Sequence, residues 1–268
     1  MPKYTCKTCG VQQSNTQNHS NLCPICEDER QYVPSSGQEW IKLADHYNQH
    51  HINWVKVETN AYQLSLEPKI GIGQTAFFIE TKHGNYLWDC LPLINDKLIE
   101  DIKAKGGLNA IAISHPHYYS NAADWATEFN IPIYIHHDDK EWFQDDDDNV
   151  LFWQGDTLNL EDDLTLIKCG GHFNGGTILH WSNTHDNKGA VFTADIIAPQ
   201  ARHNSLSFMY SYPNKIPLSG QAVKHIGKIV SPYAFDRLYG PFGTNVMPHA
   251  DKIVQQSVKR YLEAIKCV

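Results

Sequence analysis

Short apolar runs alternate with amphipathic stretches along this chain from about residue 62 to its end. Short runs of apolar and aromatic residues bounded by turn residues are typical of strands buried in a sheet. The strands predicted in this way are TAFFIE (75–80), NYLWDC (85–90), NAIAIS (109–114), IPIYIH (131–136), LTLIKC (164–169), TILHWS (177–182) and AVFTAD (190–195). Apolar residues at helical spacing predict helices over 96–107, 123–130, 219–230 and 250–265. Strand pairs followed by alternating strands and helices indicate a layered α/β domain.

The first sixty residues or so have a different texture and predict separate segments. We expect a small cysteine-rich ribbon over 1–30, a linker and a helix over 31–61, and the α/β domain over 62–268. Pro, Ser and Gly residues mark the linker, and the helix is expected over 38–51 (QEWIKLADHYNQHH). The aspartate run at 145–148 is interpreted as a solvated loop.

Composition places the chain among ordinary globular proteins. Its 268 residues are 41% hydrophobic and 19% charged, which provides a sizeable core and excludes a disordered or fibrous chain. The formal net charge of −8 disfavours binding to the phosphates of nucleic acids. No apolar run approaches the ~20 residues needed to cross a bilayer, and the first residues lack a signal-peptide pattern. We therefore expect a soluble, cytoplasmic protein.

Four of the seven cysteines lie within the first 26 residues, in two C-x-x-C pairs. Cys6 and Cys9 form CKTC, Cys23 and Cys26 form CPIC, and thirteen residues separate the pairs. Each turn directs two sulfurs to one point, so we predict that the four thiolates bind one structural zinc ion. Two disulfides are the alternative, which a reducing compartment disfavours. The pattern resembles a zinc ribbon and also a rubredoxin, which holds iron, but Glu27 stands where rubredoxins usually carry Gly.

Polar residues that directly follow buried strands carry the candidate chemistry, because sites assemble at strand ends in α/β sheets. His115 and His117 follow NAIAIS, and Pro116 favours an extended segment in which both imidazoles face the same side. His172 follows LTLIKC in a glycine-rich turn, and Asp195 ends AVFTAD. Three imidazoles beside a carboxylate are a typical ligand set for one zinc ion, and such a set also accepts iron.

The order of these motifs resembles the metallo-β-lactamase-fold hydrolases. HPH, GGHFNGG and FTAD occur in the family's order over roughly residues 62–268, and NYLWDC is similar to the family's strand that ends in Asp, here Asp89. The resemblance implies a four-layer αβ/βα sandwich with its site between two sheet edges. The cysteine ribbon ahead of the sandwich resembles a subgroup with an N-terminal zinc-ribbon (rubredoxin-like) segment.

This chain departs from the family pattern at the second metal position. The family has Asp then His where this chain has Tyr119 then Ser120, and GPFG at 240–243 replaces a turn that usually supplies another His. The first position keeps all three histidines, so we expect a single metal there. Asp195 is expected to complete the metal shell or to act as general base, and Tyr119 to donate a hydrogen bond to a developing oxyanion.

These features predict a zinc-dependent hydrolase of a small-molecule ester, thioester or amide that uses one zinc-activated water. A non-catalytic or weakly active protein that binds a metal or metabolite on the same fold is the alternative. An iron-dependent redox protein with a rubredoxin-like module is the third hypothesis. The expected partner is a small-molecule substrate, with no nucleic acid and no membrane, and the sequence leaves the oligomeric state open.

Several further residues are interpreted as structural. His180 lies within TILHW and is expected to be a hydrogen-bonded core histidine, while His203 and His249 are weaker ligand candidates on loops. The aromatic-rich segment 208–218 either lines a pocket or packs as a surface loop. Two cysteines at the ends of predicted strands are interpreted as small buried residues; they are Cys90 and Cys169.

Overall fold

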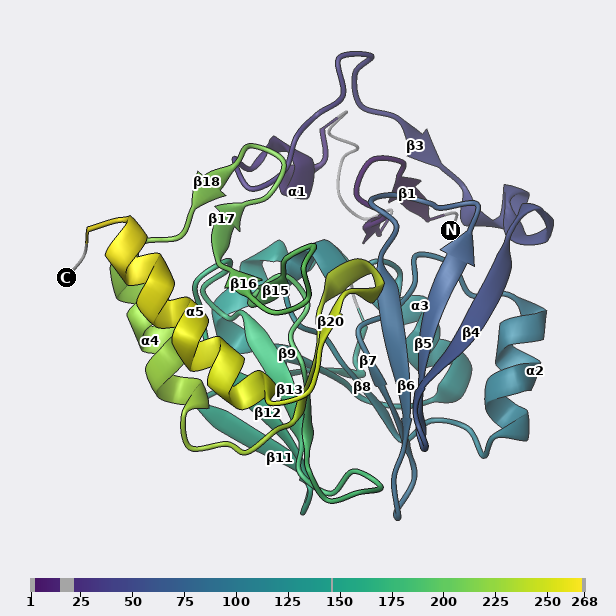
Figure 1. The fold of residues 1–268 in the computed structure, drawn as a ribbon. Coiled ribbons are helices and arrows are strands. Elements are labelled where there is room, and N and C mark those ends of the chain that lie inside the picture. The colour runs from purple at the N-terminus through teal and green to yellow at the C-terminus, as the bar shows by residue number, and fades with distance from the viewer. Residues whose placement is uncertain (1–2, 15–21, 146, 267–268) are drawn as a thin grey trace. The chain divides into compact units, whose positions relative to one another are not determined.

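The computed structural model describes residues 3–14, 22–145 and 147–266, and the chain divides into two units (Figure 1). The first unit comprises Met1–Ile135 and Lys140–Phe152, and the second comprises His136–Asp139 and Trp153–Val268. Each unit contains a β-sheet with helices, so each is described by itself.

The cysteine-rich segment of the first unit forms a small three-stranded antiparallel sheet in the order β2-β1-β3. Its elements are β1 (Tyr4–Cys6), β2 (Gln12–Gln13), the short helix α1 (Pro24–Glu27) and β3 (Trp40–Ile41). Pro24 is tolerated in the first turn of α1 because the backbone there has no helical acceptor for an N–H. Few apolar side chains other than the cysteines are buried in this segment, so its own core is small.

The helix predicted over 38–51 is wrong. The chain instead forms β3, two 3-10 turns (Leu43–Asp45 and Tyr47–Gln49) and the start of β4. Trp40 pairs with Cys6 and Ile41 with Thr5, so backbone pairing with the cysteine segment overrides a weak helical pattern. The boundaries predicted at residues 30 and 61 stay predictions.

Most of the first unit is built on a seven-stranded sheet in the order β10-β9-β8-β7-β6-β5-β4. These strands are β4 (His51–Glu58), β5 (Ala61–Glu67), β6 (Thr75–Glu80), β7 (Asn85–Trp88), β8 (Ala110–Ala112), β9 (Ile133–His136) and β10 (Val150–Trp153). Neighbours from β4 to β7 pair antiparallel, whereas β7, β8 and β9 pair parallel through the crossover helices α2 (Asp96–Ala104) and α3 (Ala122–Phe129). The ends of β7 and β8 therefore lie at one edge of the sheet, where the histidine loop begins.

The second unit contains a six-stranded sheet in the order β11-β12-β13-β14-β19-β20. Its strands are β11 (Thr157–Glu161), β12 (Leu164–Lys168), β13 (Thr177–Trp181), β14 (Ala190–Phe192), β19 (Arg237–Tyr239) and β20 (Asn245–Val246). Helices α4 (Gly220–Val230) and α5 (Ala250–Ala264) lie side by side (Figure 1), and their apolar faces form one core cluster with side chains of the sheet. Two small hairpins complete the unit: β15 (Ala198–Pro199) with β16 (Leu206–Ser207), and β17 (Met209–Ser211) with β18 (Ile216–Pro217).

The predicted α/β fold class is confirmed, and each strand and helix predicted from residue 75 onward is present within a few residues of its expected bounds. The solvated loop predicted over 145–148 is wrong at Asp145. Its carboxylate is buried and forms an ion pair with Lys3 Nζ at 2.8 Å, and Lys3 also bonds Asp124 at 2.8 Å. None of the helices in the described residues has the length and apolar composition needed to span a bilayer.

Candidate metal centres

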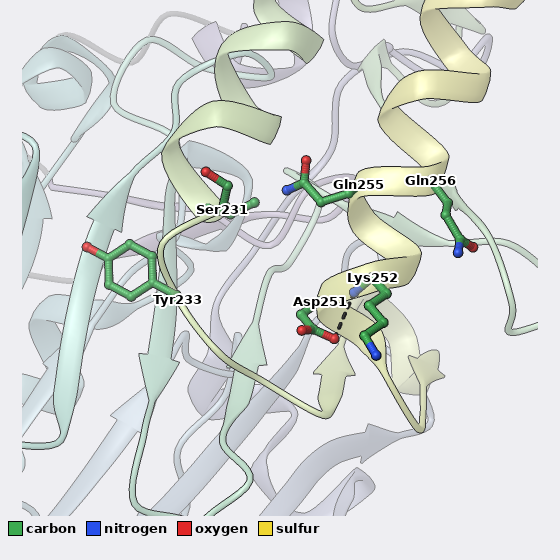
Figure 2. Close-up of a pocket in the computed structure, with 7 residues that line it drawn as sticks. Ser231, Tyr233, Asp251, Lys252, Gln255 and Gln256 are labelled. Carbon is green, nitrogen blue, oxygen red and sulfur yellow. Dashed lines mark hydrogen bonds between the residues drawn. The ribbon is translucent and has the colours of Figure 1, made fainter.

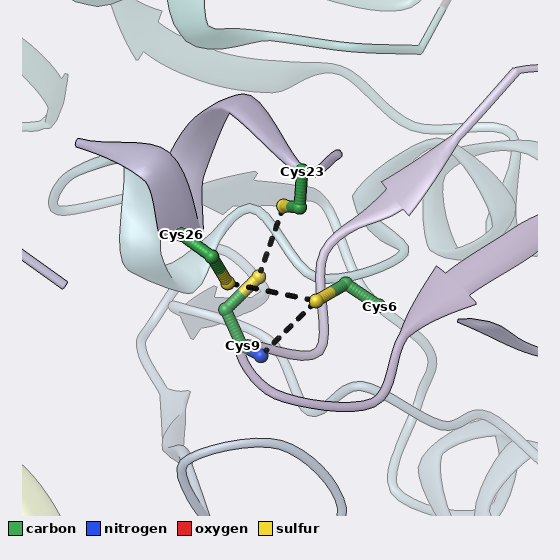
Figure 3. Close-up of side chains that lie close together, drawn as sticks. All are labelled: Cys6, Cys9, Cys23 and Cys26. Carbon is green, nitrogen blue, oxygen red and sulfur yellow. Dashed lines mark hydrogen bonds between the residues drawn. The ribbon is translucent and has the colours of Figure 1, made fainter. Parts of the chain in front are cut away.

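The four N-terminal cysteines form one buried cluster (Figure 3). Their sulfur atoms all lie within 4.8 Å of one another. The Cys6 and Cys26 sulfurs are 3.6 Å apart, as are those of Cys9 and Cys23, and all four are free cysteines. A disulfide requires sulfurs at about 2.05 Å, so the disulfide alternative does not describe this cluster.

Hydrogen bonds to sulfur show that the cluster suits thiolates. The backbone N–H of Cys9 donates to Cys6 Sγ at 3.5 Å, and the Gln38 amide donates to the same sulfur at 3.1 Å. Hydrogen bonds from the neighbouring thiols lower the pKa of Cys6, while burial raises the pKa of Cys9. Four sulfurs gathered in this way suit zinc or iron.

His115 and His117 lie in the loop that follows β8. Asp89 Oδ1 accepts the backbone N–H of Ser114 at 2.8 Å, which ties the start of this loop to the end of β7. Ser114 Oγ lies 2.9 Å from His115 Nδ1. The two imidazole rings are buried, with centroids 5.2 Å apart in a T-shaped arrangement, and each ring offers a nitrogen within 4.8 Å of the other.

The predicted extended conformation of the HPH motif is wrong beyond its first residue. His115 is extended, at φ −170° and ψ 170°, but Pro116–Tyr118 forms a 3-10 turn. Proline fits the first position of such a turn because its ring fixes φ. The imidazoles therefore approach each other around a turn and not along one face of a strand.

His172 and Asp195 form the matching pair in the second unit. His172 follows β12 after Gly170 and Gly171, which adopt φ of 66° and 88° that favour glycine. His172 and Asp195 are buried, and they offer a ring nitrogen and a carboxylate oxygen within 4.8 Å of each other. The pair therefore places one imidazole and one carboxylate at the ends of β12 and β14.

Two contacts to this pair come from the segment that the sequence left undecided. His172 Nδ1 lies 3.1 Å from the carbonyl oxygen of Met209, and the Tyr212 hydroxyl donates to the Asp195 carbonyl oxygen at 3.0 Å. Burial, with a smaller effect of Asp195, raises the pKa of Tyr212, so this hydroxyl stays protonated and keeps donating. The aromatic-rich run that begins FMYSYP left open whether this segment lines a pocket or packs on the surface, so the sequence did not predict these contacts.

The residues at the expected second metal position are not metal ligands of the usual kinds. Tyr119 is buried and packs edge-on against Phe143 at 5.5 Å between centroids, and its catalytic role stays a prediction. Ser120 Oγ donates to the Cys90 carbonyl oxygen at 3.3 Å. In the second unit, Phe242 is 46% exposed at φ 55°.

The weaker histidine candidates have other contacts. His180 is buried with Nε2 3.0 Å from the Ala234 carbonyl oxygen, which confirms it as a hydrogen-bonded core histidine. His203 Nδ1 lies 2.8 Å from the Asn245 carbonyl oxygen on the surface, and His249 lies 3.5 Å from Asp236. Cys90 and Cys169 are buried, as predicted.

A cavity of about 330 Å³ lies between α4 and α5 (Figure 2), away from the predicted site residues of its unit. It is lined by Val230, Ser231, Tyr233, Asp251, Lys252, Gln255 and Gln256. The figure shows these polar groups pointing in different directions, and the dashed line is a local bond in which the Lys252 N–H donates to Asp251. Among the residues that the structure describes, no group of three or more His, Cys, Asp or Glu side chains suited to a metal ion lines this cavity.

The chain has the metallo-β-lactamase fold. The metallo-β-lactamase DIM-1 is similar with a TM-score of 0.61 and 14% identity, over 79% of this chain and 98% of that chain. The metallo-β-lactamase FIM-1 from Pseudomonas aeruginosa, solved in its mono-zinc form, is similar with a TM-score of 0.55 and 13% identity, over 78% of this chain and 96% of that chain. No protein-family model matches the chain.

A closer relationship is found to the uncharacterized protein YmaE of Bacillus subtilis (strain 168). The two are 47% identical over 267 residues, which cover 99% of this chain and 97% of YmaE. The chain therefore belongs to the family of YmaE.

Proposed function

We propose that the histidine pair of the first unit and the histidine–aspartate pair of the second form one metal site of a hydrolase. The ligands would be His115, His117 and His172, with Asp195 beside them. The substrate we propose is a small-molecule ester, thioester or amide.

The bond between His172 Nδ1 and the Met209 carbonyl oxygen is the observation that carries this proposal. A carbonyl oxygen only accepts, so Nδ1 carries the proton and Nε2 keeps the lone pair that binds a metal. Metal-ligating histidines almost always have their second nitrogen held in this way. Ser114 Oγ lies 2.9 Å from His115 Nδ1, and because a hydroxyl can accept as well as donate, this contact is compatible with the same tautomer at His115.

A single zinc ion is the proposed cofactor of this site. Tyr119 and Ser120 stand where the second ion's ligands would be, and neither a phenol packed on Phe143 nor a serine bonded to Cys90 is a usual zinc ligand. FIM-1, which shares this fold, was solved in a mono-zinc form, which supports a one-ion site on such a scaffold.

The proposed roles of the protein groups follow from their chemistry. A bound zinc ion would act as a Lewis acid that lowers the pKa of a coordinated water toward ~7. The Asp195 carboxylate would accept or orient a proton at the reacting water, as a general base. The Tyr119 hydroxyl would donate a hydrogen bond to the oxyanion that develops on the substrate carbonyl.

The four-cysteine cluster is proposed to hold a second, structural zinc ion. Its thiols must stay reduced to bind metal, so we propose a cytoplasmic location, where disulfides are rare. The small-molecule substrate is the proposed partner, without nucleic acid or membrane, because the formal net charge is −8.

Metal analysis and a hydrolysis screen test this function together. The full-length protein is expected to hold two zinc ions per chain, and His117→Ala is expected to hold one and to lose turnover of any ester, thioester or amide found. His203→Ala, at a surface histidine, is the matched control and should match wild type. Equal metal content in His117→Ala and wild type would contradict the site.

Tyr119→Phe should lower kcat by roughly 10²-fold, as loss of one oxyanion donor does.

A second candidate function is a metal- or metabolite-binding protein without catalysis. The replacement of second-position ligands by Tyr119 and Ser120 is the observation that favours it. Two bound ions, both of normal affinity, with no turnover across the screen would support this second function over the first.

A further inference from the structure

Gln74 connects the cysteine cluster to the histidine loop. This side chain lies just before β6 and is 1% exposed. Its amide nitrogen donates to the carbonyl oxygen of Cys9 and also to the carbonyl oxygen of His117, the latter at 3.1 Å. A single buried amide group therefore joins a residue of the cysteine cluster to a residue of the histidine pair.

A second connection runs through Gln12, on β2. Its backbone N–H donates to the carbonyl oxygen of Ser120 at 2.8 Å. Its side-chain amide donates to Asp124 Oδ2 at 2.9 Å, and Lys3 contacts the other oxygen of the same carboxylate. Gln12 of β2 and Lys3, just before β1, thus connect the chain around the first cysteine turn to the histidine loop and to α3.

Close backbone packing makes the first cysteine turn a rigid neighbour of the segment that carries Gln74. Gly71 adopts φ +60°, and a Cβ added there would lie 2.7 Å from the backbone nitrogen of Gly10 and 2.8 Å from the carbonyl carbon of Cys9. Real Cβ atoms do not approach backbone so closely, so the contact requires glycine. A shift of the cysteine turn would therefore disturb the chain that leads into Gln74.

We infer that the cysteine cluster is a positioning element for the histidine loop, and that Gln74 is the positioning residue between them. Few apolar side chains are buried in the cysteine segment besides the cysteines, so a bound ion supplies much of its order. A loaded cluster would then hold the Cys9 carbonyl oxygen more firmly in place for Gln74. Loading the cluster strengthens metal binding at His115 and His117, and by linkage the reverse also holds. This inference rests on the proposed metal site.

The test measures metal affinity at the two sites separately in the full-length protein. Apo protein is titrated with Co²⁺, because four-thiolate cobalt shows sulfur charge-transfer absorption that a histidine site lacks. The affinity of the histidine site is then obtained by competition with a chelator. Gln74→Met keeps the size of the side chain but removes both donated bonds. Gln63→Met, on β5, is the matched control.

Gln74→Met is expected to retain the charge-transfer absorption of the cluster and to bind the second ion about 10- to 100-fold more weakly, as loss of an outer-shell partner does. Gln63→Met should bind both ions as wild type does. If Gln74→Met and wild type bind the second ion equally, the inference is overturned while the proposed site stands. If wild type binds no second ion, the proposed function itself fails.

A second pair of variants acts from the cysteine side. The methyl group added in Gly71→Ala should push against the backbone of Cys9 and Gly10. The affinity of the histidine site for its metal ion should then fall by a similar factor, even with the cysteine cluster loaded. Gly37→Ala is its control, because Gly37 also has a positive φ (+93°) but a Cβ there meets nothing within 4 Å. Equal second-ion affinity in Gly71→Ala and Gly37→Ala would count against the coupling, and this comparison still applies if Gln74→Met does not fold.

Discussion

The four-cysteine cluster and the histidine-containing pairs place their candidate ligand side chains by opposite means. The cluster sits on strands of three and two residues and a helix of four, with little apolar core of its own. The pairs follow β8, β12 and β14, whose side chains are largely buried in sheets. The comparison implies that the cluster would depend on a bound ion for its order, whereas the pairs take most of their geometry from the sheets.

Removal of one cluster ligand is expected to have the largest effect. Cys9→Ser should lose one metal equivalent per chain and expose the backbone of residues 3–13 to hydrogen exchange. Structural zinc sites are worth roughly 10–16 kcal/mol of apparent binding free energy, so a bound zinc ion would stabilise this segment more than its small core does. Metal analysis and hydrogen-exchange mass spectrometry measure the two effects.

Cys169→Ser is the matched control, because Cys169 is a buried free cysteine outside the cluster. It should keep both metal equivalents and normal exchange in the N-terminal segment. Unchanged protection of that segment in Cys9→Ser would show that its order does not come from metal. The proposed difference between the cysteine cluster and the histidine-containing pairs would then be wrong.

Loss of the hydrogen bond between Asp89 and the backbone of Ser114, at the start of the histidine loop, should have a smaller effect on stability. This effect should not depend on metal. Asp89→Ala removes the acceptor for the Ser114 N–H, and Asp89 adopts φ 59°, which Asp tolerates better than Ala. The free energy of unfolding should fall by about 1–3 kcal/mol, the cost of leaving a buried donor without its acceptor. Urea denaturation with and without a chelator measures this.

Asp89→Asn keeps a side-chain oxygen and the conformational preference, so it should recover most of the stability. The decrease in Asp89→Ala should be similar in chelated and metal-loaded protein. A decrease that appears only in loaded protein would show that the ion, and not the sheet edge, orders this loop.

The smallest expected effect is a pH dependence of the second unit's core. Burial lowers the pKa of His180 below its ordinary value of 6.5, although its bond to the Ala234 carbonyl oxygen opposes this. The folded state thus binds a proton more weakly than the unfolded state, so the stabilising contribution is present above pH ~6.5 and is lost as pH falls below it. In chelated protein, the free energy of unfolding of wild type should fall slightly more than that of His180→Gln between about pH 7.5 and 5.5. Urea denaturation at the two pH values measures this. An equal change in the free energy of unfolding for wild type and His180→Gln would disprove the prediction.

The sequence predicted what depends on local spacing. The C-x-x-C pairs specified a cluster because each turn brings two sulfurs together. The apolar runs and amphipathic stretches specified β6 to β9, β12 to β14 and the helices α2 to α5 because burial imposes those periods. The outer strands β4, β5, β10, β11, β19 and β20 were not predicted.

Features that depend on tertiary partners were missed. The segment over 38–51 follows β1 and not its own helical pattern, because Trp40 and Ile41 pair with that strand. Asp145 is buried because Lys3, far away in sequence, neutralises it. Met209 contributes only a carbonyl oxygen, which no side-chain pattern reveals. Such contacts become visible only when the chain is folded.

The bond from His172 to the Met209 carbonyl oxygen has a consequence for how this family can vary. The acceptor belongs to the main chain, so any amino acid at position 209 presents it as long as β17 keeps its path. Substitutions at position 209 should therefore leave the proton of His172 on Nδ1. The side chain at position 209 could therefore be changed by design without loss of the hydrogen bond that orients the His172 ring.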